Sequence, residues 1–198
     1  MRIKNLFLLA CLSVLSFSSA QAVDILFDSF ESPVVSGFDS TQFSPGWTLN
    51  RPSSPSQIGL RTGAGSQSGT QVVQMDASGT PSGASFSQSL ATNINQTYTV
   101  SLYYASFFGL AGKVRVDFGS SFFTSPTATT NSFSQLTFTH VATTTSTLLT
   151  ITDLTTDTAS SDVLVDDVQV STVPEPASVA LLGLGGLAMV VARKRRAQ

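Results

Sequence analysis

The C-terminal tail constrains the organisation of this chain more than any other feature. Residues 177–192 form an uncharged, mostly apolar run, and the basic residues Arg193, Lys194, Arg195 and Arg196 follow it directly. As a helix rising about 1.5 Å per residue the run spans roughly 24 Å, against a hydrocarbon core of about 30 Å. The span suffices if the basic side chains snorkel. We therefore expect a transmembrane helix at 177–192 and a basic stop at 193–196 that stays in the cytoplasm, with everything before Pro174 across the membrane.

A short polar motif precedes this span. It consists of Val173, Pro174, Glu175 and Pro176. The order of motif, span and basic stop over residues 173–198 resembles the PEP-CTERM sorting tail of Gram-negative envelope proteins. The resemblance implies an exosortase, a membrane transpeptidase, that cuts near the motif and releases or transfers the protein. On this interpretation the four motif residues serve recognition, not catalysis. An ordinary C-terminal anchor is the alternative.

The N-terminus predicts export. Arg2 and Lys4 precede the apolar stretch 6–17, and Ala20 and Ala22 form an A-x-A cleavage site. We expect a helical signal peptide at 1–22, cut by signal peptidase so that the mature chain begins at Val23. Leu8-Leu9-Ala10-Cys11 also spells a lipoprotein box, which leaves lipidation as an alternative. Cys11 is the only cysteine, so signal cleavage leaves no thiol and no disulfide.

The exported part is acidic. Residues 23–173 contain four basic and eleven acidic residues, a net charge of −7 that the near-neutral whole chain conceals. This charge argues against nucleic acid and anionic lipid as partners.

Alternating polar and apolar residues predict an all-β domain. Val114, Val116 and Phe118 alternate with charged residues, as a half-buried strand requires. The same alternation marks 97–104 and 85–90, and further strands are expected at 25–30, 47–50, 71–76, 133–139, 147–154 and 163–170. About nine short strands predict one β-sandwich of the jelly-roll class over residues 23–172. Residues 51–70 are rich in Ser, Gly and Pro, and we expect a surface loop there.

Four local patterns in order carry a second resemblance. They are Phe27-Asp28-Ser29-Phe30-Glu31-Ser32-Pro33, Gly46-Trp47, the segment 69–76 and the segment 165–170. Together they resemble the galactose-binding-like and carbohydrate-binding-module jelly rolls of secreted bacterial proteins. In such domains an acid on the first strand and one on the last often share a structural calcium ion, which implies Glu31 with Asp166 or Asp167. Carboxylate oxygens suit Ca²⁺.

The pair Asp166-Asp167 also breaks the alternation of its strand. One of its carboxylates should therefore point inward, where it needs a partner. The alternative is that both are solvated edge or bulge residues.

Exposed aromatic side chains are the candidates for glycan contact. We single out Tyr103, Trp47 and Phe108, although Trp47 also fits a core position. Catalysis is not expected, because His140 is the only histidine and is expected at a strand end, and no thiol remains. A paired-carboxylate glycosidase stays open as an alternative.

The sequence thus predicts a non-enzymatic protein that is exported through the inner membrane, anchored there transiently and sorted by an exosortase to the cell surface or the medium. Its expected role is structural or glycan-binding, within exopolysaccharide or biofilm. The alternatives are a carbohydrate-active enzyme, a lectin for a soluble sugar, or a membrane-anchored coat protein.

Overall fold

A computed structural model describes residues 21–51, 57–76, 83–108, 111–155 and 162–174. Val23–Val173 form one compact unit. Among the described residues the regular structure is all β. The strands are β1 (Asp24–Asp28), β2 (Phe38–Asp39), β3 (Thr48–Asn50), β4 (Gln57–Thr62), β5 (Gln71–Asp76), β6 (Ser85–Ala91), β7 (Thr97–Phe107), β8 (Val114–Phe118), β9 (Ser121–Thr124), β10 (Ser134–Val141), β11 (Ser146–Asp153) and β12 (Asp162–Thr172).

The predicted signal peptide up to Ala20 and the tail from Glu175 onward, with its span and basic stop, lie outside the described residues. Within the described ranges no helix is long and apolar enough to cross a membrane.

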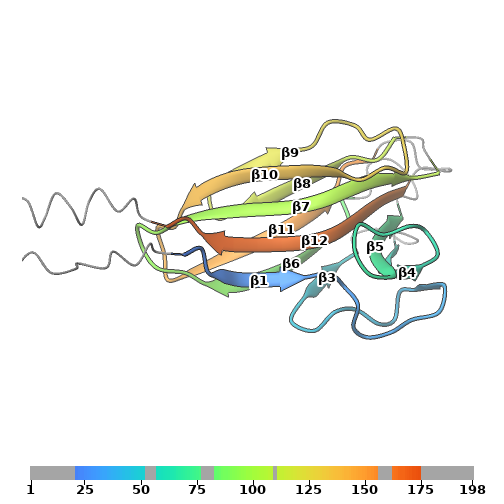
Figure 1. The fold of residues 1–198 in the computed structure, drawn as a ribbon, viewed down its shortest axis with the longest axis horizontal. Coiled ribbons are helices and arrows are strands. Elements are labelled where there is room, and N and C mark those ends of the chain that lie inside the picture. The colour runs from blue at the N-terminus through green and yellow to red at the C-terminus, as the bar shows by residue number, and fades with distance from the viewer. Residues whose placement is uncertain (1–20, 52–56, 77–82, 109–110, 156–161, 175–198) are drawn as a thin grey trace, which may run out of the picture. The chain divides into compact units, whose positions relative to one another are not determined.

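The strands form two antiparallel sheets that pack as a sandwich (Figure 1). Sheet A has the order β10-β7-β12-β5-β4-β2, with β1 also paired to β12. Sheet B has the order β3-β6-β11-β8-β9. The first and last strands are neighbours, since Phe27 pairs with Gln169.

Strand β12 changes partner halfway along its length. Asp162–Val165 pair with β5, whereas Val168–Ser171 pair with β1. Between these halves the register with β7 shifts by a bulge between Asp166 and Gln169, and Asp167 has a positive φ of 47°. A bulge leaves a residue unpaired and re-aims its side chain. The Asp166 and Asp167 carboxylates therefore lie at the point where the partner of β12 changes from β5 to β1.

The core lies between the sheets and belongs entirely to the compact unit. Alternate residues of the long strands face inward, among them Val100 and Leu102 of β7 and Leu149 and Ile151 of β11. The core residues all lie between Phe30 and Val170, so residues 23–173 contain a complete hydrophobic core of their own.

One sequence prediction is wrong. Residues 51–70 are not a single surface loop, because Gln57–Thr62 form β4 and pair with β5. Ile58 and Leu60 are fully buried opposite Met75 and Val73. Two apolar residues at alternate positions were sufficient for a strand, because cross-strand partners supplied the packing that the Ser/Gly-rich flanks lack.

Candidate functional site

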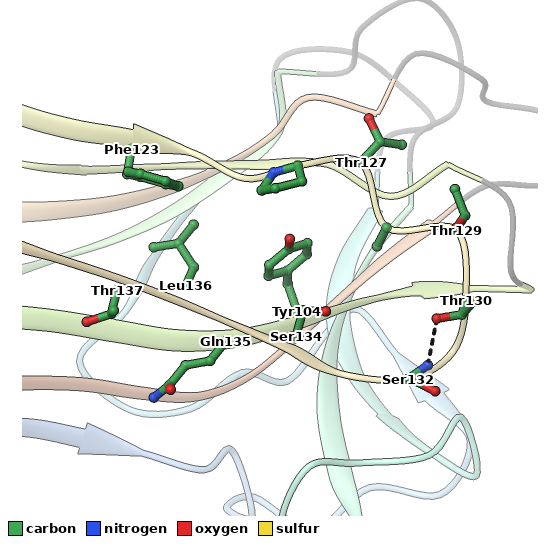
Figure 2. A pocket seen from close by; sticks show the side chains of 12 residues that line it. Tyr104, Phe123, Thr127, Thr129, Thr130, Ser132, Ser134, Gln135, Leu136 and Thr137 are labelled. Carbon is green, nitrogen blue, oxygen red and sulfur yellow. Dashed lines mark hydrogen bonds between the residues drawn. The ribbon is translucent and has the colours of Figure 1, made fainter.

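A pocket opens beside the sandwich at β9, β10 and the segment that joins them (Figure 2). Its volume is about 540 Å³, within the range of about 300–1,000 Å³ that ligand sites occupy. The lining residues are Tyr104, Phe123, Pro126, Thr127, Ala128, Thr129, Thr130, Ser132, Ser134, Gln135, Leu136 and Thr137.

The floor of the pocket is apolar and comes from both sheets. Tyr104 of β7 and Leu136 of β10 are buried. Phe123 of β9 is 41% exposed and stacks on Phe138 with ring centroids 6.4 Å apart. The exposed ring of Phe123 gives a ligand an apolar surface on which to lie.

The segment between β9 and β10 forms the rim and is held at several points. Ala128 and Gly112 exchange two backbone hydrogen bonds, and the Ser106 amide donates to the Thr130 carbonyl at 3.0 Å. Ser125 is fixed on β8, because its amide donates to the Val114 carbonyl and its hydroxyl accepts from the Val114 amide. The hydroxyl groups of the rim are thus presented by a tethered backbone.

The pocket carries no formal charge. Every polar lining residue is Ser, Thr, Gln or Tyr. Burial raises the pKa of the Tyr104 phenol, and a hydrogen bond with the Ser125 side chain opposes this only in part. Tyr104 therefore keeps its proton at neutral pH and can both donate and accept. A ring floor with a hydroxyl rim suits a neutral, hydroxyl-bearing ligand.

The three predicted glycan contacts do not lie together in this pocket. Tyr103 is half-buried on the outer face of β7, opposite Gln135 and Asp166. Trp47 packs on Phe86 with ring centroids 5.0 Å apart, and its indole donates to Asp28 at 2.7 Å. Phe108 is 64% exposed just after β7. The contacts of Trp47 therefore agree with the alternative interpretation, in which this residue packs against the core.

The predicted calcium ligands converge on one segment, residues 63–70, between β4 and β5. Both Glu31 oxygens accept hydrogen bonds there, from the Thr70 and Gln71 amides and from the Thr70 hydroxyl. These bonds lower the Glu31 pKa, although partial burial, the largest single influence, acts to raise it.

Asp166 is the carboxylate of the pair that is buried and has partners. It lies opposite Tyr103 on the outer face of sheet A, in contact with residues 67 and 68, rather than in the core between the sheets. It is fully buried, and its Oδ2 accepts from the Gln67 and Ser68 amides at 2.8 and 3.1 Å. Its Oδ1 accepts from the Asp167 amide at 2.8 Å. Burial raises the Asp166 pKa to about 6. Asp167 in turn accepts from the Ser68 hydroxyl at 2.5 Å.

These carboxylates have hydrogen-bond partners without a calcium ion. Five of their six oxygens accept hydrogen bonds from N–H or O–H groups. Within the described residues no group of three acidic, His or Cys side chains gathers as a metal site. Calcium binding stays a prediction.

His140 lies near the end of β10 and is buried. Its Nδ1 lies 3.0 Å from the Ser121 hydroxyl, and its ring packs edge-on against Phe118. Burial lowers the His140 pKa, so the ring is neutral at pH 7 and fills the core.

The sequence did not predict this pocket, and Phe123 is not among the three aromatic residues singled out from it. The signal that marks the rim is the stretch 124–132, which holds Ser, Thr and Pro126 and no charged residue. Tyr104 and Leu136 gave no such signal, because only the pairing of β7 with β10 brings them together.

Residues 172–196 match the PEP-CTERM protein-sorting motif. No curated protein matches the sequence of this chain.

Solved structures resemble the sandwich. The Stig cyclase Fisc from Fischerella sp. TAU, solved with an indole compound, has a TM-score of 0.57 at 20% identity and covers 78% of this chain and 99% of its own. The CBM22-1 xylan-binding domain of Paenibacillus barcinonensis Xyn10C has a TM-score of 0.54 at 18% identity, over 78% and 97% of the two chains.

The module TmCBM61 in complex with β-1,4-galactotriose has a TM-score of 0.51 at 14% identity, over 68% and 91%. Identities this low establish the fold alone. The chain therefore carries a PEP-CTERM protein-sorting motif at residues 172–196, behind a β-sandwich with the fold of carbohydrate-binding modules.

Proposed function

We propose that this protein is an exosortase substrate whose exported sandwich binds a neutral glycan of the extracellular matrix in the pocket beside β9 and β10. The observation that carries the proposal is the lining: aromatic rings below, hydroxyl and amide groups around the mouth, and no formal charge. Sugar rings present alternating apolar faces and hydroxyl groups, and this surface offers a counterpart to both. The sorting motif supports the delivery of the domain to the cell surface or the medium.

Binding without hydrolysis is the activity that we infer. Glycoside hydrolysis needs two carboxylates flanking the bond, about 5–10 Å apart, and the pocket lining contains no Asp or Glu. The junction acids already accept several hydrogen bonds, and His140 is buried beside Phe118. We therefore infer that the pocket binds a glycan without cleaving it.

The test is affinity electrophoresis and calorimetry of residues 23–173 with neutral polysaccharides and with uronic-acid polysaccharides. We expect binding to a neutral chain and none to the acidic ones. Phe123→Ala should weaken binding about tenfold, the loss of a typical aromatic contact.

Phe122→Ala is the matched control. Phe122 is the neighbouring residue on β9, 59% exposed, outside the pocket lining and covered by the Arg115 guanidinium at 4.2 Å from its ring centroid. Its loss should leave the affinity unchanged. Equal weakening by both variants, or no binding to any neutral glycan, would contradict the proposal.

A further inference from the structure

The outer strands of the two sheets differ sharply in length and charge. Five described strands have one strand neighbour each: β1, β2, β3, β9 and β10. Strands β2, β3 and β9 have two, three and four residues. Strand β1 has five, with Asp24 and Asp28 at its ends and an irregular register. Short, charged or bulged edges discourage pairing with another chain.

Strand β10 has none of these protections. It is eight residues long, Ser134–Val141, and it pairs with β7 in unbroken register. It contains no Lys, Arg, Asp, Glu or Pro. Among the described residues β7 is its one strand partner, and Figure 1 shows β10 running along one margin of sheet A. Its outward groups are therefore free to extend the sheet.

The stretches of sequence that contain β10 and its partner β7 are also uncharged, in a domain that is otherwise acidic. From Gly119 to Thr152 the chain has no Asp, Glu, Lys or Arg, and neither has the stretch 77–112 that contains β7. The acidic residues of the domain lie before, between and after these stretches. Two copies of a domain with a net charge of −7 repel one another least where neither carries charge.

We propose that β10 pairs antiparallel with β10 of a second copy, so that sheet A continues across a two-fold axis. Two identical strands that run in opposite directions are related by such an axis, which makes the contact self-complementary. Exposed Thr137 and Thr139 of one copy then lie opposite Thr137 and Thr139 of the second copy. Thr–Thr pairs across neighbouring strands are favourable. The inference does not rest on glycan binding.

Residues 23–173 test this, because they contain their own core. Sedimentation between about 1 µM and about 1 mM should show a monomer–dimer equilibrium. The amide hydrogens of β10 should exchange more slowly as the concentration rises, since pairing protects them. The double variant Thr139→Lys with Val141→Lys should raise the dissociation constant about tenfold or more, because it places like charges across the two-fold axis.

Neither substituted residue lines the pocket, but Ser134, Gln135, Leu136 and Thr137 of β10 do. Glycan binding is therefore measured at the lowest concentration of the series, where the protein is a monomer, so that it reports on the proposed function alone. Thr48→Lys is the control: Thr48 is exposed on the short edge strand β3, and the same charge there should leave the association unchanged. Melting temperatures confirm that each variant is folded. A monomer at every concentration, equal association of the double variant and the wild type, or protection located outside β10 would overturn the proposal.

Discussion

At the scale of single residues, Asp166 shows how a carboxylate is accommodated at a buried position on the outer face of sheet A. Its carboxylate is fully buried and accepts three backbone N–H groups. Burial raises its pKa to about 6, and these hydrogen bonds only partly oppose the shift. The residue stabilises the bulge in β12 because it satisfies amides that no strand pairs.

Replacing Asp166 with Asn should destabilise the domain. The N–H₂ group of the Asn side chain would face backbone N–H groups, which are donors as well. Buried polar groups left without a hydrogen bond in this way cost about 1–3 kcal/mol. Urea unfolding at neutral pH measures the loss, with Asp24→Asn at the exposed start of β1 as a control. An unchanged unfolding free energy would contradict the role of Asp166.

The same residue predicts a pH dependence. Its folded pKa of about 6 lies above the ordinary value of 3.8, so between these values the folded state holds a proton that the unfolded chain has released. The part of the stability that comes from protonation of Asp166 is therefore present below this window and lost as the pH rises through it. The excess stability of the wild type over Asp166→Asn should shrink between about pH 4 and about pH 6, as followed by urea unfolding at several pH values. If the wild type instead gained stability relative to Asp166→Asn over this pH range, the raised pKa of Asp166 would be contradicted.

Chelation tests the calcium prediction against the geometry. Because Glu31, Asp166 and Asp167 already have N–H and O–H partners, the fold needs no ion to satisfy these carboxylates, and we expect EDTA to leave the melting temperature of residues 23–173 unchanged. Calcium titration by calorimetry is the companion measurement. A fall in melting temperature that calcium restores would re-establish the metal site.

At the scale of elements, the segment between β4 and β5 depends on Gly69. This residue has φ of +60°, and a Cβ there would lie 2.3 Å from the Glu31 Oε1. Gly69→Ala should therefore lower stability by about 1–3 kcal/mol, through backbone strain and displacement of the carboxylate.

Gly63→Ala is a matched control in the same segment. It also has a positive φ, of +77°, but open space around it, so it isolates the backbone cost. Thermal unfolding of the two variants should show a larger loss for Gly69→Ala. Equal losses would mean that contact with Glu31 contributes nothing.

At the scale of the whole molecule, the sorting motif predicts the fate of the chain. In the host, mass spectrometry should find a species that starts at Val23 and ends near Pro174, and only when the exosortase is present. Replacing Pro174, Glu175 and Pro176 with Ala should leave the tail uncut, because the recognition motif is gone. An intact tail in both strains would instead indicate a plain membrane anchor.

The sequence by itself determined the sorting tail and most strands, because each depends on neighbouring residues. The run before Arg193 and the alternation around Val114 are local patterns. The broken alternation at Asp166 and Asp167 also indicated a carboxylate that needs partners, although Asp166 has them on the outer face of sheet A and not in the core between the sheets.

Only the tertiary structure decided what these residues contact. The partners of Asp166 are the amides of Gln67 and Ser68, about a hundred positions away in sequence. The pocket joins Tyr104, Phe123 and Leu136, which lie on three different strands. Strand β4 formed against its local composition for the same reason. Sheet pairing sets such contacts through register across distant strands, and no local pattern records that register.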